Sequence, residues 1–428
     1  MSRFWLNGVL VAGDLADVDM QAALRAHYED HKGNPPLCDC SDVRPRMYIA
    51  RLGAQYILKR WPASGHEHAV DCDRYEPPPE ASGLGRLLGS AIREDPLTGD
   101  VDLRLGFPLK RQPRDGAAPA EAHPEDTIDN EGGKPSPSRA GLRAILHYLW
   151  DQAELTHWKP GMKGKRNWWI VRSRLLDAAR RMTAKSVRLH RRLFIPEPFR
   201  VEAKDEIRLR RRALLQTVAS AKAARDLMMF LVEVKDIGPS TYGYKLVARN
   251  VPDDPFYLSE DLYRLLRRRF ETELEMMART EGKGHLLAFG TLSVKPSGVA
   301  TIEDVTLMAT TAEWIPVSDE TEAVVVDYAV ATGRAFMKPL RYNLGPGRAL
   351  AAALFTDGPD KPTALYIVRP DETEVLAQAR QELIDSGHTA TVLWELAENP
   401  VPSDLIDAIV AGRKARSRSE STGSLVVC

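Results

Sequence analysis

Two short stretches, Leu37-Cys-Asp-Cys40 and Gly65-His-Glu-His-Ala-Val-Asp-Cys72, decide the fold of the first part of this chain. They contain three of the four cysteines in the 428-residue sequence. Two cysteines separated by one residue are poor disulfide partners for each other, but both can bind the same metal ion. Zinc takes four Cys or His ligands in a tetrahedron. We therefore predict a zinc site whose ligands are Cys38, Cys40, His68 and Cys72.

The histidine ligand has an alternative, because His66 lies close to His68. We favour His68, since a spacing of four residues lets one turn bring His68 and Cys72 to the same side. A site with four protein ligands leaves no position for a reactive water, so the predicted zinc is structural. The competing interpretation is that these are ordinary buried thiols with two surface histidines.

The segments around these stretches have the alternating pattern of β-strands. Residues 48–52 and 55–61 predict a hairpin that the metal would hold, and residues 87–107 predict a second hairpin that turns at residues 95–99. We therefore expect a zinc-bearing, β-rich domain at residues 1–108. Residues 109–139 are rich in Pro, Gly and acidic residues, which predicts a disordered linker, and residues 399–428 predict a polar tail.

Positive charge is concentrated in one segment. The 59 basic and 59 acidic residues cancel, yet residues 158–212 contain 18 basic and only 5 acidic residues, with Trp interleaved. Several cations are needed to neutralise phosphates, and Trp or Arg planes stack on bases. The segment therefore predicts a nucleic-acid interface, with DNA as partner in preference to RNA. The residues assigned to it are Lys163, Lys165, Arg166, Trp168, Trp169, Arg172, Arg180 and Arg181.

The same segment shows helical periodicity. Residues 140–155 and 167–182 predict two helices, and a strand-like run follows near residue 193, an order typical of a winged-helix-like unit. We place a basic helical module at residues 140–215. The competing interpretation is that the cations pair with acidic parts of the same chain and that the Trp side chains are core.

The remaining sequence predicts two mixed domains in an α+β multidomain protein. Residues 216–316 alternate strand-like runs with one helix at residues 259–279, which indicates an α/β domain. Residues 317–398 predict the order α-β-β-β-α-β, which resembles the restriction-endonuclease-like fold. The predicted elements of that domain are a helix at 320–331, strands near 335–340, 351–356 and 363–368, a helix at 371–385 and a strand at 390–396.

The chemistry of such a nuclease is incomplete in this chain. Metal-dependent cleavage needs carboxylates on the first helix and second strand, and an acidic-x-Lys on the third strand. Glu320 or Glu322 fits the first place and Asp357 follows the second strand, but the third strand supplies neither group. The pair Glu233 and Lys235 occurs earlier, where alternation predicts a solvent-facing position. We assign no catalytic residue, and the rival hypothesis is a metal-dependent nuclease that uses Glu322 and Asp357.

Two features bear on localisation. No run of about 18 apolar residues occurs that would span a bilayer. The first 15 residues lack the charged, apolar and small-residue layout of a secretory signal. We therefore expect a cytoplasmic protein with no membrane partner.

The chain is similar to the bacterial family known as domain of unknown function 1173, whose members are often encoded on mobile and conjugative elements. The resemblance implies that Cys38, Cys40 and Cys72 are required, and it supplies no activity. It favours an accessory protein of a mobile element, with a protein-interaction component of a DNA-transfer complex as a further alternative. The residues that carry it are the three cysteines with Gly65-His-Glu-His68 and Cys72-Asp-Arg-Tyr-Glu-Pro77, Gly164-Lys-Arg-Asn-Trp168, Phe336-Met-Lys-Pro-Leu-Arg-Tyr342 and Leu354-Phe-Thr-Asp357.

Overall fold

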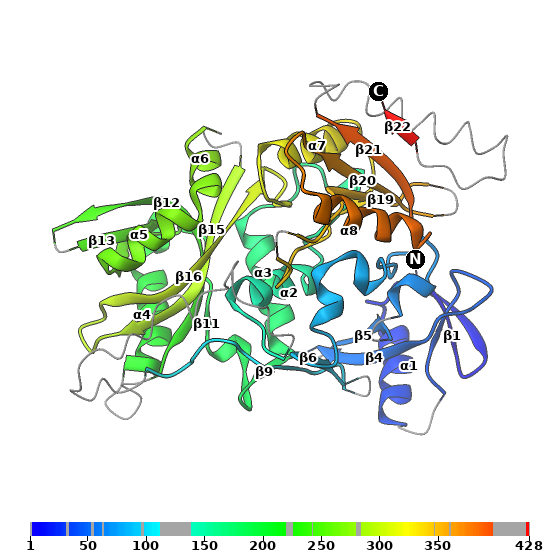
Figure 1. Ribbon diagram of the computed structural model, residues 1–428. Coiled ribbons are helices and arrows are strands. Elements are labelled where there is room, and N and C mark those ends of the chain that lie inside the picture. The colour runs from blue at the N-terminus through cyan, green and yellow to red at the C-terminus, as the bar shows by residue number, and fades with distance from the viewer. Residues whose placement is uncertain are drawn as a thin grey trace. The chain divides into compact units, whose positions relative to one another are not determined.

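The chain folds into α-helices and several β-sheets, which confirms the predicted α+β class (Figure 1). It divides into two compact units, one formed by residues 1–103, 335–339 and 347–428 and the other by residues 104–334 and 340–346. Each unit combines segments that are distant in sequence, whereas the predicted domains run consecutively along the chain. The computed structural model describes residues 2–30, 34–52, 55–61, 64–95, 98–111, 138–219, 226–241, 243–279, 284–345, 347–358, 361–396 and 425–427.

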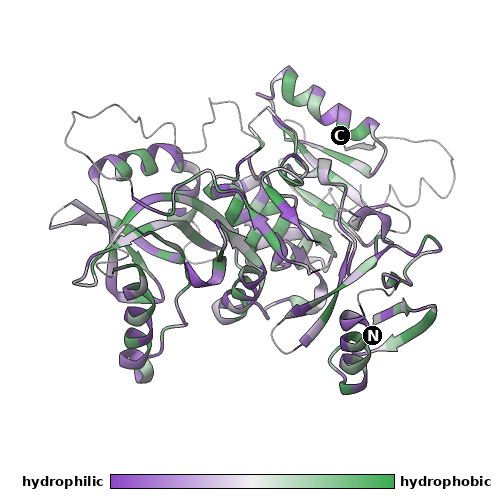
Figure 2. Ribbon diagram, turned by 90° about the horizontal axis from the view of Figure 1, so that it is seen from below, coloured by the Kyte–Doolittle hydropathy of each residue, from purple (hydrophilic) through white to green (hydrophobic). Residues whose placement is uncertain are grey.

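Most of the predicted linker and tail, residues 112–137 and 397–424, lies outside these described ranges. In the part of the chain that is described, no helix combines the length and apolarity needed to cross a membrane. The elements are amphipathic, and hydrophilic and hydrophobic residues share the same helices and strands (Figure 2). Each unit is therefore built around its own apolar cores.

The N-terminal part of the first unit is β-rich, as predicted. It has a three-stranded antiparallel sheet in the order β2-β1-β3 and a hairpin of β4 and β5. Apolar side chains from these strands and from helix α1 form one core, in which Phe4, Leu24 and Met47 are fully buried. The bounds are β1 (Ser2–Leu6), β2 (Val9–Gly13), α1 (Val18–Glu29), β3 (Leu37–Cys38), β4 (Met47–Leu52), β5 (Gln55–Arg60), and the short hairpin β6 (Ile92–Glu94) with β7 (Val101–Leu103).

A second sheet of this unit comes from the C-terminal part of the chain. Its strands follow one another in sequence order, antiparallel from β18 to β20 and parallel from β20 to β22, with helix α8 as the crossover between β20 and β21. Strand β22 lies within the predicted polar tail. The bounds are β18 (Phe336–Met337), β19 (Ala353–Phe355), β20 (Thr363–Val368), α8 (Glu374–Asp385), β21 (Ala390–Glu395) and β22 (Leu425–Val427).

Helix α7 (Glu320–Ala331) precedes this sheet, so the α-β-β-β-α-β order predicted for the segment is present. The helix, however, belongs to the second unit, while the strands belong to the first. The predicted element order is therefore confirmed. A restriction-endonuclease-like domain remains a hypothesis.

In the second unit, the module predicted at residues 140–215 begins with helices α2 (Leu142–Gln152) and α3 (Trp168–Arg180), with the short strand β8 (His157–Trp158) between them. Strands β9 (Met182–Ala184) and β10 (Val187–Arg188) then form a hairpin. Its turn residues Lys185 and Ser186 have φ values of 49° and 64°, the left-handed conformation that a two-residue hairpin turn requires. The two predicted helices are present, but this hairpin was not predicted. The strand predicted near residue 193 is present and pairs with a strand of the following sheet, so a winged-helix-like unit remains a hypothesis.

The rest of the second unit is a sheet that closes on itself in the order β12-β13-β14-β16-β15-β12. Strands β14 and β16 are parallel, and the other neighbouring pairs are antiparallel. The further strands β11 and β17 pair with β12 and β16. The bounds are β11 (Leu193–Phe194), α4 (Lys204–Ala219), β12 (Met228–Ser240), β13 (Gly243–Ala248), β14 (Val251–Leu258), α5 (Glu260–Arg269), α6 (Glu271–Arg279), β15 (Gly284–Val294), β16 (Ala300–Thr311) and β17 (Pro316–Val317).

The single helix predicted at residues 259–279 is divided in two. Helix α5 ends at Phe270, whose backbone angles of φ −114° and ψ 35° leave the helical region. The Phe270 side chain is buried in the core of the closed sheet. Burial of this aromatic ring therefore accompanies a break that the continuous helical pattern did not reveal.

Gly290 allows the central strand β15 to approach β16 closely. A Cβ at this position would lie 2.0 Å from the carbonyl oxygen of Asp304. We expect Gly290→Ala to lower the free energy of unfolding by about 3 kcal/mol, the upper end of the usual cost of overpacking. Chemical denaturation measures this change. Gly161→Ala, where the added Cβ has no neighbour within 4 Å, is the control, and equal midpoints for the two variants would contradict the close approach.

Candidate metal centre and basic surface

The first two cysteines lie at the end of strand β3. Cys38 pairs with Phe4 of β1, and its backbone N–H donates to the carbonyl of Pro45, which closes the loop after the strand. Asp39, between the two cysteines, accepts a hydrogen bond of 2.9 Å from the Trp5 indole and pairs with Arg3 at 2.7 Å. The sheet therefore fixes the direction in which both thiols point.

The other two residues lie in a compact loop that follows strand β5. The 3-10 turn Gly65–Glu67 leads into His68, and the backbone N–H groups of Cys72 and Glu76 donate to the carbonyls of Ala69 and Gly65. A Cβ on Gly65 would lie 2.5 Å from the Cβ of Glu76, so only glycine allows the loop to close this tightly. His68 and Cys72 are thereby held on one side of the loop.

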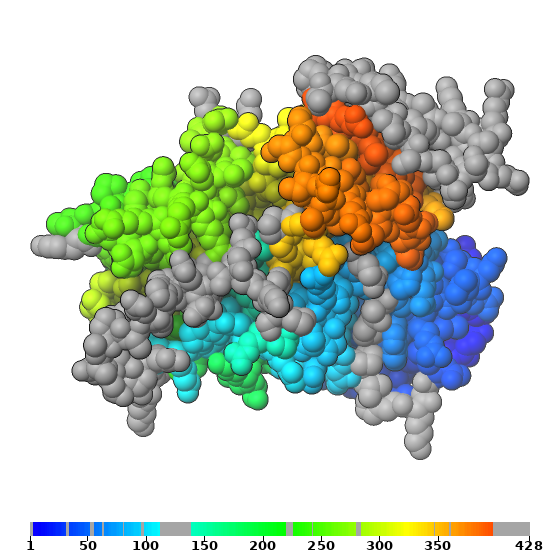
Figure 3. All heavy atoms as spheres, in the orientation of Figure 1, coloured from blue at the N-terminus to red at the C-terminus, as the bar shows by residue number. Residues whose placement is uncertain are grey.

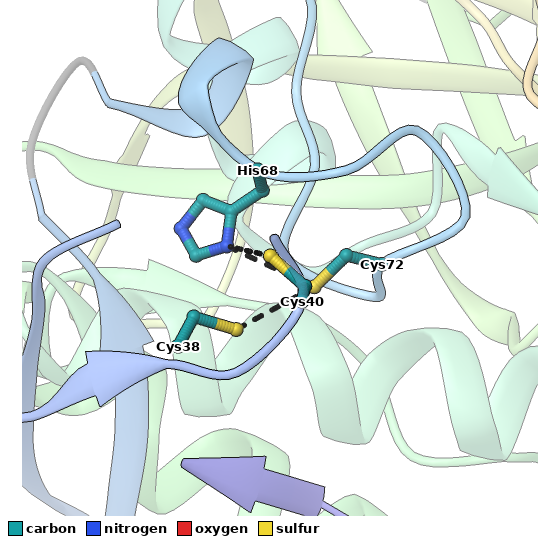
Figure 4. A group of neighbouring side chains, drawn as sticks. All are labelled: Cys38, Cys40, His68 and Cys72. Carbon is teal, nitrogen blue, oxygen red and sulfur yellow. Dashed lines mark hydrogen bonds between the residues drawn. The ribbon is translucent and has the colours of Figure 1, made fainter. Parts of the chain in front are cut away.

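The four side chains converge on one point (Figure 4). The Cys38 and Cys72 sulfurs are 3.8 Å apart, and the Nδ1 atom of His68 lies 3.5 Å from the Cys40 sulfur and 3.8 Å from the Cys72 sulfur. A tetrahedral zinc ion with bonds of about 2.3 Å to sulfur and 2.0 Å to nitrogen spaces its ligands about 3.5 to 3.8 Å apart. The residues therefore fit a metal ion of this size, whose presence would fix the four side chains together.

Hydrogen bonds around the thiols shift their pKa values in opposite directions. Hydrogen bonding with the Cys38 thiol, with His68 and with the backbone N–H of Arg74 lowers the pKa of Cys72 to about 4. The pKa of Cys38 is raised by its hydrogen bond with Cys72 and by burial. The backbone N–H of Ala69 also donates to the Cys40 sulfur, at 3.4 Å. Donors are thus already directed at the sulfurs, as a bound thiolate requires.

The predicted alternative ligand is not part of the cluster. His66 is exposed, whereas His68 is 3% exposed, and the four clustered ligand atoms all lie within 4.8 Å of one another. Within the described ranges this is the only group of three or more His, Cys, Asp or Glu side chains that could hold a metal ion. The predicted set Cys38, Cys40, His68 and Cys72 is therefore the set that the fold brings together.

The loop that carries His68 and Cys72 also contributes to a second core. Tyr75, three residues after Cys72, is buried against Met337, Leu354 and Tyr366 of the C-terminal sheet. The backbone N–H of Tyr75 donates to the carbonyl of Cys72, so the ligand and the core residue share one turn. A metal at the site would consequently stabilise the C-terminal sheet as well as the N-terminal one.

The residues predicted to bind nucleic acid fall into two groups. Arg166, Trp168 and Arg172 serve the interior of the second unit. The Arg166 guanidinium donates to the carbonyls of Leu155, His157 and Glu313, and burial lowers its pKa to about 10. The Trp168 indole donates to Pro196, and Arg172 donates to Ile195. These three side chains hold helix α3 to its neighbours, so they do not belong to the open basic surface.

Four other residues of the predicted interface are exposed to solvent. Trp169 is 63% exposed at the start of α3, and Lys163, Lys165 and Arg180 are exposed as well. Neither lysine has a carboxylate within ion-pair distance among the residues that the structure describes, while Arg180 lies 3.8 Å from Asp177. The β9–β10 hairpin also lies at the surface (Figure 3).

The hydrogen-bonding groups of Arg181 are incompletely satisfied. Its Nε and Nη1 atoms are buried and have no hydrogen-bond partner in the described ranges, and the same holds for Nδ1 of His190. The pKa of His190 is lowered by burial and by the nearby charges of Arg180, Arg191 and Arg188. Buried donors without an acceptor are costly, so this part of the segment is less well satisfied than the cations that reach solvent.

Internal pairing accounts for the later part of the basic segment. Arg192 pairs with Asp226 at 2.6 Å, Arg210 with Glu197 at 2.7 Å, and Arg211 with Asp253 at 2.9 Å. The competing interpretation of the sequence therefore applies to residues 192–211. The open cations lie earlier, between residues 163 and 191.

The acidic residues considered for a nuclease have structural partners. Glu322 completes the start of helix α7 by accepting from the Ser318 N–H, and Glu320 lies 3.3 Å from Arg279. Glu233 was expected to face solvent, and this expectation is wrong. Its carboxylate is 8% exposed and bonded to His285 at 2.8 Å and to Arg249 at 3.0 Å, because β12 is a central strand with neighbours on both sides.

Together these features define an α+β protein with a candidate Cys3His metal centre and an open basic surface. The family model described as "Protein of unknown function (DUF1173)" matches residues 13–397. The chain therefore belongs to this family, as its resemblance predicted. No curated protein and no solved structure matched the chain in these comparisons.

A matched pair of histidine variants tests the metal centre. We expect the purified protein to contain about one equivalent of zinc, His68→Ala to lose it, and His66→Ala to keep it, because only His68 faces the sulfurs. Elemental analysis of metal content gives the answer. Equal zinc in both variants would contradict the assigned ligand set, and a folded protein without metal would contradict the site as a whole.

Proposed function

We propose that this protein is a zinc-containing, nucleic-acid-binding accessory protein in which the zinc is structural. The zinc assignment is supported by the ligand spacing, which fits a tetrahedron, and by the complete set of four protein ligands. Such a site stabilises the fold and leaves no open position for a substrate. The function therefore rests on the basic surface.

The observation that carries nucleic-acid binding is the group of exposed cations Lys163, Lys165 and Arg180, of which neither lysine has a carboxylate within ion-pair distance among the described residues. Phosphodiester oxygens accept hydrogen bonds from guanidinium groups and bring the negative charge that the cluster lacks. The exposed Trp169 ring adds a surface on which a base can stack. DNA is the proposed partner in preference to RNA, in the mobile-element setting that the family resemblance implies.

The salt dependence of binding tests this proposal. We expect the double variant Lys163→Ala and Lys165→Ala to bind a DNA duplex more weakly and to lower the slope of log affinity against log salt by about one unit per lost phosphate contact. Fluorescence anisotropy across a KCl series measures both. Arg267→Ala with Arg268→Ala, two exposed cations on helix α5, is the charge-matched control. Identical slopes for the two double variants would argue against the basic surface.

We also propose that the protein does not cleave nucleic acid. Glu320, Glu322 and Glu233 are engaged in caps and ion pairs, and strand β20 offers no lysine to activate a water. Incubation with single- and double-stranded DNA in Mg²⁺ or Mn²⁺ should leave the substrates intact. Cleavage that disappears in Asp357→Asn would instead establish the nuclease hypothesis.

A further inference from the structure

The closed sheet of the second unit has a specific topology. Numbered along the chain from β12, its five strands are arranged in the order 1-2-3-5-4-1, and helices α5 and α6 lie between the third and fourth strands. The first strand is long and irregular: residues 228–233 pair with β15, and residues 234–240 pair with β13 across a register shift between Val234 and Asp236. A five-stranded Greek-key barrel of this kind is the OB-fold, which binds oligonucleotides and oligosaccharides.

The interior of this barrel is filled by its own side chains. Phe230 and Val232 of β12 and Phe256 of β14 are buried there, and Leu266 and Phe270 close one end from the helical connection. Stacked rings of Phe230 and Phe256, with centroids 5.7 Å apart, occupy the centre. A ligand of this barrel must therefore bind on its outer face.

One part of the outer face is covered and another is open. Helix α2 contacts β15 and β16, and Leu287 and Phe289, which do not belong to the barrel core, are fully buried. The second half of β12 with β13 and β14 carries exposed or half-buried residues instead, and the β12–β13 hairpin extends outward (Figure 1). This open face corresponds to the strands that OB-folds use for binding.

The open face combines an aromatic ring with positive charge. Lys245 of β13 lies directly opposite Tyr257 of β14 on one side and Gly238 of β12 on the other. Their neighbour Leu246 is fully buried in the core, so the row from Gly238 to Tyr257 faces outward. Gly238 has no side chain, and a carboxylate oxygen of Asp236 lies 3.8 Å from the position that a Cβ would take there. Lys235 is exposed nearby on the same strand.

We infer that the outer face of β12, β13 and β14 binds single-stranded nucleic acid, with Tyr257 stacking on a base and Lys245 contacting a phosphate. The aromatic ring can stack on a base while the neighbouring lysine pairs with the phosphate of the same strand. A neutral oligosaccharide has no charge with which the lysine could pair. The inference rests on the proposed function in taking nucleic acid as the ligand. It assigns single strands to a surface separate from the basic segment.

Binding of a labelled oligothymidine of about 15 nucleotides, within the usual site size of an OB-fold, tests the inference. We expect Tyr257→Ala to weaken single-strand binding by about 5- to 150-fold, the range that corresponds to loss of one stacked base. Duplex binding should change little. Tyr257→Phe should restore single-strand affinity, because the ring remains, and Lys245→Ala should lower the salt slope by about one unit.

The variants of the basic surface separate this inference from the proposed function. Loss of duplex affinity in Lys163→Ala with Lys165→Ala, but unchanged single-strand affinity in Tyr257→Ala and Lys245→Ala, would overturn the inference and leave the proposed function standing. Selective loss of single-strand affinity in Tyr257→Ala, in a protein whose melting temperature is unchanged, supports it. Binding of a neutral oligosaccharide in place of oligothymidine, abolished in Tyr257→Ala, would also overturn it.

Discussion

The convergence of three sulfurs and one imidazole nitrogen within 4.8 Å is the constraint on which the first unit depends. One pair of ligands is delivered by a strand end, and the other by a loop closed at Gly65. Thiolates packed this closely repel one another unless a cation or protons neutralise them. The hydrogen bond between Cys38 and Cys72 raises the pKa of Cys38 and lowers that of Cys72, and a zinc ion would neutralise the thiolates and tie both segments to one centre.

This centre also links parts of the chain that are far apart in sequence. Tyr75 leaves the ligand loop and enters the core of the C-terminal sheet, where Leu354 and Tyr366 surround it. A metal bound there would stabilise two sheets of one unit. Its coordination would add to the stability that the N-terminal part gains from a core completed near the other end of the chain.

The basic residues of the second unit fall into two groups, those paired with acidic residues and those that face solvent. Acidic residues neutralise Arg192, Arg210 and Arg211 locally, which leaves the preceding cations to define the outward field. Lys163, Lys165 and Arg180 are the exposed cations that an anionic partner can reach, and the exposed Trp169 ring belongs to the same segment. The barrel beside it offers a different chemistry, with a ring and a lysine in one row across three strands. We therefore propose two separate surfaces in one unit, one for the backbone of a duplex and one for the bases of a single strand.

The sequence by itself determined the residues of the candidate metal centre, the α+β class and the order of elements from residue 320 to residue 396, because ligand spacing and local periodicity depend on neighbouring residues. It also located the basic segment, but it did not show which cations are open: Arg166 and Trp168 have the same local pattern as Lys165 and Trp169, and only packing turned the first two inward. Burial of Glu233 likewise depended on β15, more than 50 residues away in sequence. The closed barrel and the union of both chain ends in one unit were decided by the tertiary structure alone, since strand pairing across long loops depends on contacts that no local pattern encodes.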